Sequence, residues 1–438
     1  MSEHRLNIFD GSHRLGQIIY NAKDEHFSFT YEDQWITSPT AYPLSPHFPL
    51  NEKQASSSTI RRFVENLLPE GRALDIASAH YNVTKNNVFA LIRQLGQETA
   101  GALSFVADGQ ERLADTTSRR EVSSEEMAAR IARRDELPFA LWDGKVRMSV
   151  AGFQDKLALY FEGSRMFLVE GEFSSTHILK PEPTDKRMSF LVANEHFCMT
   201  LARRIGLNVA PVDLLRLPTP VLVVERFDRV RRAQSVTRLH IIDACQALDF
   251  PVSYKYERNL GSGVDVRNIR DGVSFQQLFT LQEKCSSKAR AVKVMTDWAL
   301  MQFLLGNSDA HGKNFSFFCR REGLEPTPFY DLVSVVQYDS IMHEMAMAYG
   351  DEFELEKISP FALADFAHRC GLDRKFLSRE MKRLAKLAME QAPVLAESPV
   401  YQGGEKQLVG SIAELVEKQA RRLIELAPQL LDVDPDLL

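Results

Sequence analysis

The sequence lacks the features of a membrane protein, of a disulfide-bonded secreted protein and of a zinc protein. Its 438 residues include five cysteines, which are scattered along the chain without a CxxC pair. Such spacing favours reduced thiols in a cytosol over a disulfide framework or a zinc site. No segment approaches the roughly 18 uninterrupted apolar residues of a membrane helix, and the first residues lack a basic-then-apolar signal sequence. We therefore expect a soluble, cytoplasmic protein without membrane contact.

An excess of positive charge is also missing. The formal net charge is −6 at pH 7, which argues against a general nucleic-acid-binding protein. Arg226, Arg229, Arg231 and Arg232 form one local basic cluster, for which a solvated face is the plainest interpretation. With 44% hydrophobic and 26% charged residues, the composition is that of an ordinary globular protein, and the length allows two or three domains.

Hydrophobic periodicity divides the chain into a strand-rich half and a helical half. Short alternating stretches predict strands at 5–37, 146–180 and 221–227, and a further strand pair at 342–354. Helical periods mark 58–73, 83–96, 194–206, 274–305, 361–391 and 409–430. This is an α+β pattern that fits the two-lobed layout of protein kinases, although any α+β protein fits it as well. We expect an N-terminal subdomain at 1–145, a small-lobe core at 146–226 and a helical large lobe at 227–438.

The most informative stretch runs from Met301 to Asp331. An apolar helix is predicted to end at Gly306; Asp309 and, five positions on, Asn314 follow, and Asp331 comes after a hairpin and a short strand-like segment at Phe329. Protein kinases space a catalytic aspartate, a magnesium-binding asparagine and a second metal-binding aspartate in this way. No HRD precedes, however, and Asp331 is followed by Leu-Val rather than Phe-Gly, so plain turn-capping residues remain an alternative.

A second group of residues lies upstream. Lys180 ends an apolar strand and precedes a helix that carries Glu195, as a phosphate-binding lysine and its helical carboxylate would. An edge lysine would look the same. The turn at 149–156 contains Gly152 and Lys156 and allows a phosphate to approach, but it is neither a GxGxxG nor a Walker A loop, and an ordinary hairpin also explains it.

Several stretches, taken in their order, point to one family. They are SVAGFQDKLAL (149–159), THILKP (176–181), NEHFCMTLARRIGLNVAP (194–211), VVERFDR (223–229), RLHIIDACQALDFPVSYKYE (238–257), GNSDAHGKNFSFF (306–318) and TPFYDLVSV (327–335). Together they resemble the HipA family, the serine/threonine kinase toxins of bacterial HipBA toxin–antitoxin modules. The resemblance spans nearly all of residues 1–340, whereas the helical region after residue 355 matches weakly.

The resemblance implies a role for individual residues. Asp309 would be the catalytic base, Asn314 and Asp331 would bind Mg²⁺, and Ser149 would be the autophosphorylated serine whose modification expels the phosphate loop and silences the kinase. Phe153 departs from the family, in which a small residue is common there. The ATP-binding residues that it implies are Val150, Ala151, Gly152, Phe153, Gln154, Asp155 and Lys156 of the phosphate loop, then Lys180, Glu225, Arg226, Phe227, His311 and Lys313.

The resemblance also implies an activity and partners. It predicts an ATP- and Mg²⁺-dependent serine/threonine-protein kinase that binds a HipB-like helix-turn-helix antitoxin and, through it, operator DNA. Its substrate would be a translation component, such as glutamyl-tRNA synthetase, whose phosphorylation causes growth arrest and persistence. Two alternatives stay open: a catalytically inactive pseudokinase that acts as a co-repressor or scaffold, and a nucleotide sensor without catalysis. Intact Asp309, Asn314 and Asp331 speak against the pseudokinase.

Overall fold

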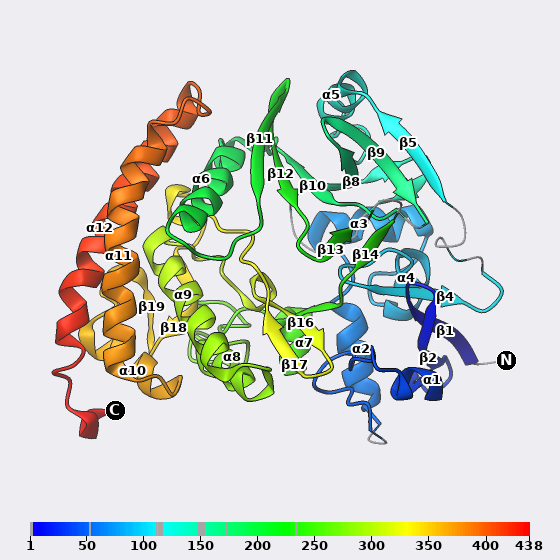
Figure 1. Cartoon of the computed structure of the whole chain (residues 1–438), viewed down its shortest axis with the longest axis horizontal. Helices are drawn as coiled ribbons and strands as arrows, with labels where there is room; N and C mark the ends of the chain where they lie inside the picture. The colour runs from blue at the N-terminus through cyan, green and yellow to red at the C-terminus, as the bar shows by residue number, and fades with distance from the viewer. Residues whose placement is uncertain are drawn as a thin grey trace. The chain divides into compact units, whose positions relative to one another are not determined.

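The computed structural model describes residues 3–51, 54–110, 112, 117–147, 154–171, 173–232 and 235–438 (Figure 1). The chain packs into two compact units. The first comprises Met1–Pro181, Leu215–Ile242 and Phe318–Gly323, and the second comprises Glu182–Leu214, Asp243–Phe317 and Leu324–Leu438. The division into three parts that the sequence suggests, with boundaries near 145 and 226, stays a prediction.

The first unit opens with a four-stranded antiparallel sheet in the order β3–β2–β1–β4. Leu6 and Ile8 of β1 are fully buried and Leu6 lies opposite Ile18 of β2, because residues two apart on a strand share a face. The meander predicted at 5–37 is confirmed. The elements are β1 (Glu3–Asp10), β2 (His13–Asn21), β3 (His26–Tyr31), α1 (Asp33–Thr37), α2 (Ser57–Glu65), α3 (Gly71–Tyr81), α4 (Val88–Leu95) and β4 (Leu103–Ala107).

Helix boundaries in this region follow their caps. Ser56 accepts a hydrogen bond from the Thr59 backbone nitrogen at 3.1 Å and starts α2, which ends at Glu65, ahead of Pro69. Asn87 accepts from the Ala90 backbone nitrogen at 3.0 Å, so α4 begins at Val88 rather than at 83. The prediction for this helix was therefore too long at its N-terminal end.

A six-stranded sheet follows, in the order β11–β12–β10–β8–β9–β5. The α5 residues Met127 and Ile131 pack into one apolar core with sheet residues that include Leu157, Leu159 and Leu179. Burying aliphatic side chains of this size stabilises the fold by about 1.5–3 kcal/mol each. The elements are β5 (Ser118–Val122), α5 (Ser124–Ala132), β6 (Leu141–Trp142), β7 (Lys145–Val146), β8 (Leu157–Glu162), β9 (Arg165–Glu170), β10 (His177–Pro181), β11 (Val212–Leu217), β12 (Thr219–Glu225), β13 (Arg229–Arg231) and β14 (Val236–Arg238).

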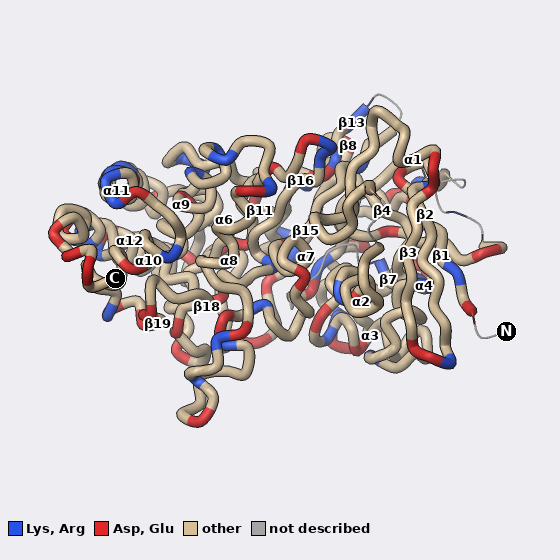
Figure 2. Tube along the Cα trace, turned by 90° about the horizontal axis from the view of Figure 1, so that it is seen from below, with Lys and Arg blue, Asp and Glu red and all other residues tan. Residues whose placement is uncertain are grey.

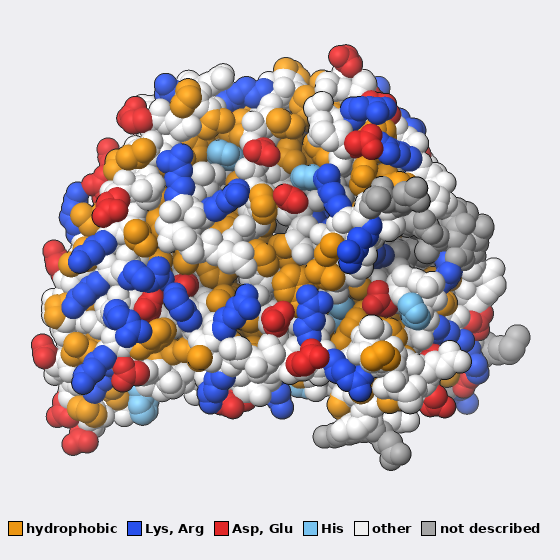
Figure 3. Space-filling model, viewed as in Figure 1, with side chains coloured by type: hydrophobic (Ala, Val, Ile, Leu, Met, Phe, Trp, Pro, Cys, Tyr) orange, Lys and Arg blue, Asp and Glu red, His pale blue; other side chains and the backbone are white. Residues whose placement is uncertain are grey.

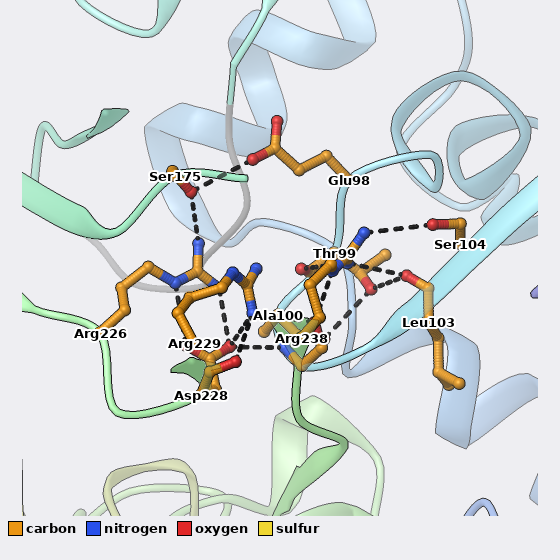
Figure 4. Close-up of polar contacts among 11 residues, drawn as sticks. Glu98, Thr99, Ala100, Leu103, Ser104, Ser175, Arg226, Asp228, Arg229 and Arg238 are labelled. Carbon is orange, nitrogen blue, oxygen red and sulfur yellow. Dashed lines mark hydrogen bonds and ion pairs between the residues drawn. The ribbon is translucent and has the colours of Figure 1, made fainter. Parts of the chain in front are cut away.

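Buried charges connect the residues after β12 to the loop before β4 (Figure 4). Asp228, 4% exposed, accepts hydrogen bonds from Arg226 Nε at 2.9 Å, from Arg229 Nη1 at 2.7 Å and from the Gly101 backbone nitrogen at 2.9 Å. Arg238 donates to the carbonyl of Thr99 at 2.9 Å. Burial acts to raise the pKa of Asp228, but the Arg226 and Arg229 guanidiniums outweigh it and hold that pKa well below its usual range. The interpretation of Arg226 and Arg229 as a solvated face was therefore wrong.

The second unit is mainly helical. From Met295 to Leu305 every residue of α9 is buried. Helices α11 and α12 pack against α9 and against each other, and α6 packs against both of them (Figure 1). The strand pair predicted at 342–354 is present as β18 and β19. Its elements are α6 (Leu191–Arg204), α7 (Ala244–Leu248), α8 (Phe275–Thr280), α9 (Lys288–Leu305), β18 (Glu344–Tyr349), β19 (Glu352–Glu354), α10 (Pro360–Arg369), α11 (Arg374–Ala396) and α12 (Gly404–Gln429). A separate three-stranded sheet, not assigned to the second unit as a whole, consists of β15 (Ile241–Asp243), β16 (Ser316–Arg320) and β17 (Gly323–Pro326).

Charge is unevenly spread in the helical unit. Lys and Arg concentrate on α11 (Figure 2), and basic side chains gather over the surface of α11 and α12 (Figure 3). Lys375, Arg379 and Lys386 of α11 are exposed. Among the described residues, no helix combines the length and the apolar character that crossing a bilayer requires.

The buried Asp228 predicts a large stability difference. Asp228→Asn should lower the free energy of unfolding by about 3–5 kcal/mol, because two buried guanidiniums lose their counter-charge. The matched control is Asp185→Asn, since Asp185 is 42% exposed and pairs with an exposed Arg187 at 2.7 Å. That change should cost far less, because solvent screens an exposed ion pair. Urea unfolding of both variants measures the difference, and equal losses would contradict the argument.

His240 predicts acid sensitivity. Its Nε2 lies 2.8 Å from the Leu44 carbonyl and therefore carries a hydrogen, while its buried Nδ1 has no hydrogen-bond partner among the described residues. Burial lowers the pKa of His240 from 6.5 to about 4. The native state binds its proton less tightly than the unfolded chain does, so this contribution to stability is complete above pH 6.5 and is lost as the pH falls toward 4.

We expect His240→Gln to reduce the steepness of this loss. Glutamine keeps an N–H donor for the Leu44 carbonyl and cannot take up a proton in this range. The free energy of unfolding, measured in urea between about pH 7 and about pH 4.5, should fall less for this variant than for the wild type. His26→Gln at an exposed position serves as the control and should leave the slope unchanged. Parallel slopes for all three proteins would show that His240 does not protonate on unfolding.

Candidate active site

The turn that carries Asp309 is built by the end of α9. Gly306 ends this helix with φ 60°, a left-handed conformation, and a Cβ there would lie 2.6 Å from the Val336 side chain. The Asn307 side chain donates to Gln302 at 2.8 Å and accepts from the Asp309 backbone nitrogen at 3.2 Å. The predicted helix end at Gly306 is confirmed, and this turn presents an exposed Asp309 side chain.

The next residues form a 3-10 turn, Gly312–Asn314, that is closed by reciprocal hydrogen bonds. His311 Nδ1 accepts from the Lys313 backbone nitrogen at 3.3 Å, and Asn314 Oδ1 accepts from the His311 backbone nitrogen at 3.3 Å. His311, Lys313 and Asn314 are 8%, 8% and 7% exposed. These side chains therefore belong to a folded, buried turn rather than to a surface loop.

Lys313 is held by a carboxylate that sequence reasoning did not identify. Its Nζ lies 2.7 Å from Asp243 Oδ2, and the two side chains are 5% and 12% exposed. Asp243 also caps α7 by accepting from the Gln246 backbone nitrogen at 2.8 Å. The Asp-x-x-Gln spacing is a sequence signal for such a cap. The ion pair has no local signal, because 70 residues separate its partners.

The two residues proposed as metal ligands lie together. Asn314 Nδ2 donates to Asp331 Oδ2 at 3.0 Å, and Asp331 has the left-handed φ of 57°. Amide and carboxylate oxygens are the donors that Mg²⁺ prefers, and protein sites for Mg²⁺ often use only one or two side chains plus phosphates and water. In the described ranges no group of three or more His, Cys, Asp or Glu side chains could hold a metal ion. The donor set thus fits Mg²⁺ on ATP and not a closed zinc site.

The loop after Asp331 is anchored on both sides. Asn194 of α6 is fully buried; its Oδ1 accepts from the Ser334 backbone nitrogen at 2.8 Å, and its Nδ2 donates to the Ser334 carbonyl at 3.0 Å. The Ser334 hydroxyl donates to the Leu305 carbonyl at 2.7 Å. Ahead of Asp331, Phe329 makes a single parallel bridge to Val209 and no strand: its nitrogen donates to the Asn208 carbonyl at 2.8 Å, and its carbonyl accepts from the Ala210 nitrogen at 2.9 Å. The strand-like segment expected at Phe329 was therefore wrong.

The remaining described candidates lie in the first unit. Lys180 on β10 is 8% exposed and pairs across the sheet with Leu222, while Glu225 of β12 lies opposite His177. Gln154 Nε2 donates to the Pro181 carbonyl at 3.3 Å, which places the end of the proposed phosphate loop beside the end of β10.

The residues around these positions complete the first-unit group. Asp155 lies 3.9 Å from Arg134, and Lys156 is half-buried. Phe227 packs edge-on against Phe318, with ring centroids 6.0 Å apart. Ser149, Val150, Ala151, Gly152 and Phe153 lie outside the described residues.

The structure therefore gathers the proposed residues into two groups. Asp309, His311, Lys313, Asn314 and Asp331 lie together in the second unit. In the first unit, Lys180 and Glu225 lie on neighbouring strands of the six-stranded sheet, and Gln154, ahead of β8, bonds the end of β10. Asp243 and Tyr256 also contact the second group, and Asn194 holds Ser334 in the loop after Asp331; all three were missed. Asn194 and Tyr256 stand in stretches that resemble the family, but nothing local in the sequence gives them a role.

Comparison with known proteins decides the family. Residues 6–106 match the HipA N-terminal domain, and residues 148–392 match the HipA-like C-terminal domain, which alone covers more than half of the chain. The chain belongs to the HipA family. The region after residue 355, whose sequence resembles the family only weakly, is included in the match up to residue 392.

Individual members of the HipA family support this assignment. The serine/threonine-protein kinase toxin HipA of Shewanella oneidensis is 41% identical over 98% of both chains. A putative kinase, Y4mE, of Sinorhizobium fredii is 32% identical over 88% of this chain and 90% of its own. In the solved Shewanella oneidensis MR-1 complex of HipA, HipB and its operator DNA, one chain with 40% identity aligns at a TM-score of 0.88, covering 98% of this chain and 100% of that one. The predicted family, the α+β kinase-like fold and the enzyme class, a serine/threonine-protein kinase, are confirmed.

The anchoring of the Asp331 loop predicts a local stability effect. Asn194→Ala should lower the free energy of unfolding by about 1–3 kcal/mol, because the buried Ser334 nitrogen and carbonyl lose their partner. It should also weaken magnesium-dependent ATP binding, since the loop that carries Asp331 loses its anchor on α6. Asn208→Ala, at an exposed side chain, is the control and should stay within about 0.5 kcal/mol. Calorimetric binding and urea unfolding check both effects; unchanged ATP binding in Asn194→Ala would rule out the anchoring role.

Proposed function

We propose that this chain transfers the γ-phosphate of ATP to a serine or threonine hydroxyl of another protein, as the toxin of a HipBA-type module. One observation carries the proposal. The turn that presents Asp309 also contains Asn314, whose side chain lies 3.0 Å from Asp331, so the base and both metal-binding side chains belong to one folded site. Phosphoryl transfer requires this positioning more than it requires covalent chemistry from the protein.

Each residue then has one task. Asp309 accepts the proton of the attacking hydroxyl, and its exposed side chain is open to a protein substrate. Asn314 and Asp331 hold Mg²⁺, which neutralises phosphate charge when it is bound with ATP. Lys180 contacts the phosphates, and the backbone at Glu225 and Phe227 meets the adenine, with Arg226 fixing that segment through Asp228. His311 and Lys313 support the nucleotide from the catalytic turn.

The proposed regulation acts through the phosphate loop. Val150 to Lys156 cover the ATP phosphates, and autophosphorylation of Ser149 expels them and silences the kinase. A phosphate adds about −1.5 to −2 charges at neutral pH, which is a large change beside a loop that must bind another phosphate. The contact of Gln154 with the Pro181 carbonyl supports the placement of this loop beside Lys180.

The proposed partners follow from the family and from charge. The protein would act in the cytoplasm with a HipB-like helix-turn-helix antitoxin, and the Shewanella oneidensis relative forms a complex with HipB and operator DNA. The exposed basic residues of α11 supply positive charge of the kind that a DNA phosphate backbone attracts (Figures 2 and 3). We propose glutamyl-tRNA synthetase as the substrate, with growth arrest and persistence as the outcome.

The alternative is a pseudokinase that serves as a co-repressor or scaffold. The closed catalytic turn and the Asn314–Asp331 contact favour the active enzyme, because a scaffold needs neither a base nor metal ligands in register. Binding of ATP without phosphate transfer would favour the scaffold.

Intact mass measurement after incubation with Mg-ATP tests the proposal. Wild-type protein should gain one phosphate on Ser149, and Asp309→Asn should gain none within the same time, because an amide cannot accept the proton. Asp432→Asn, at an exposed position near the C-terminus, is the matched control and should behave as the wild type.

The starting mass shows whether the chain is already phosphorylated, in which case a phosphatase treatment precedes the assay. If the dephosphorylated wild type binds ATP but gains no phosphate on any residue and labels no acceptor protein, the kinase proposal fails and the pseudokinase is favoured.

A further inference from the structure

Tyr256 lies against the proposed base. Its hydroxyl donates a hydrogen bond to Asp309 Oδ1, and its ring packs edge-on against His311 with centroids 4.9 Å apart and planes at 90°. Both contacts lie within the second unit. The tyrosine is therefore in contact with two residues of the catalytic turn, although it stands 53 positions before Asp309 in the sequence.

The backbone around Tyr256 is fixed on both sides. The Lys255 carbonyl accepts from the Gly312 backbone nitrogen at 2.8 Å, which connects this segment to the catalytic turn itself. Glu257 is 2% exposed; its backbone nitrogen donates to the Ala346 carbonyl at 3.0 Å, and its side chain accepts from the Ala348 nitrogen at 2.8 Å, both on β18. The residues that flank Tyr256 are thus anchored to the catalytic turn in front and to a strand behind.

The returning chain leaves little space for movement. The Gly272 nitrogen donates to the Glu257 carbonyl at 3.1 Å, and a Cβ on Gly272 would lie 1.8 Å from the Tyr256 carbonyl oxygen. Only glycine allows this approach. Arg270, from the same returning segment, pairs with the Glu257 carboxylate. The main chain of Tyr256 is therefore held from three directions.

We propose that Tyr256 is a positioning residue for phosphoryl transfer, which orients the Asp309 carboxylate toward the acceptor hydroxyl. The proposal rests on the function proposed above, in which Asp309 is the base. A carboxylate has several lone-pair sites on its two oxygens, so a hydrogen bond to Oδ1 leaves acceptor capacity for the substrate proton. A base that is oriented before the substrate arrives needs less reorganisation during the reaction.

The chemical step balances without any change in Tyr256. The oxygen of the acceptor hydroxyl forms a bond to the γ-phosphorus, the bond between that phosphorus and the β–γ bridging oxygen breaks, and ADP leaves with the electron pair. The hydroxyl proton passes to Asp309. The Tyr256 phenol keeps its own proton throughout and acts only through its hydrogen bond.

The alternative role for this contact is to block the acceptor position, which we call the placeholder role. In that role the Tyr256 hydroxyl occupies the position of the acceptor hydroxyl and has to leave before each turnover. The anchored main chain and the ring packing against His311 argue against such a movement, because the hydroxyl cannot move far while both are kept. The two roles predict opposite effects when the hydroxyl is removed.

Tyr256→Phe removes the hydroxyl and keeps the ring. The experiment measures the first-order rate constant of autophosphorylation by intact mass over a range of Mg-ATP concentrations, together with the thermal unfolding midpoint of the full chain. The rate constant at saturating Mg-ATP should fall about tenfold, while the half-saturating ATP concentration stays within about a factor of two. Tyr254→Phe removes a hydroxyl two residues away, where the ring stacks on Phe250, and should change neither quantity.

Each other result overturns the proposal. An unchanged rate constant means that the hydrogen bond has no role in catalysis, and a faster one means that Tyr256 is a placeholder. A slower rate accompanied by a lower unfolding midpoint, or shared by Tyr254→Phe, means a structural role. Asp309→Asn separates the failure of this proposal from the failure of the proposed function. If Asp309→Asn still transfers phosphate, Asp309 is not the base, whatever Tyr256→Phe does.

Discussion

The hydrogen bond between Asn314 and Asp331 is the interaction on which the proposed catalytic half-site depends. These side chains come from two loops, and a metal site with oxygen ligands forms only if both loops hold their side chains close together. The chain achieves this with buried polar contacts on each loop. The first loop closes on itself through His311 and Asn314, and the second is fixed to α6 and α9 through Asn194 and Ser334.

Both units bury paired charges. In the first unit, Asp228 pairs with two arginines after β12, and in the second, Lys313 pairs with Asp243. Buried ion pairs are seldom a net source of stability compared with apolar packing, but the loss of one partner is costly. Their value here is positional. The pair at Asp228 fixes the segment that follows Glu225, and the pair at Lys313 fixes the turn that follows Asp309.

Local signals in the sequence were enough for much of this structure. The glycine at 306, the alternation of Leu6 and Ile8, and the apolar strand that ends at Lys180 all act over a few residues, and each predicted its element. The start of α4 was missed although its signal, the Asn87 cap, is local. The other failures depend on distant parts of the chain: the bridge at Phe329 on the segment near Asn208, and the burial of Arg226 on the loop at Gly101. The contacts of Asp243 and Tyr256 with the proposed catalytic turn span 70 and 53 residues, so no local sequence pattern predicts them.

The division of tasks in the site bears on how such a kinase could be switched. The proposed catalytic turn contacts Tyr256 and Asp243, and the loop after Asp331 contacts Asn194, all inside the second unit. These contacts are made by residues other than 149–156, and a phosphate on Ser149 would add charge next to that loop in the chain. The proposed self-inhibition therefore acts on nucleotide binding and leaves the base oriented, so that removal of the phosphate restores activity without refolding of the catalytic turn. A switch that acted on Asp309 itself would have to break buried hydrogen bonds, each of which costs about 1–3 kcal/mol when a partner is left unsatisfied. Regulation through the phosphate loop avoids that cost.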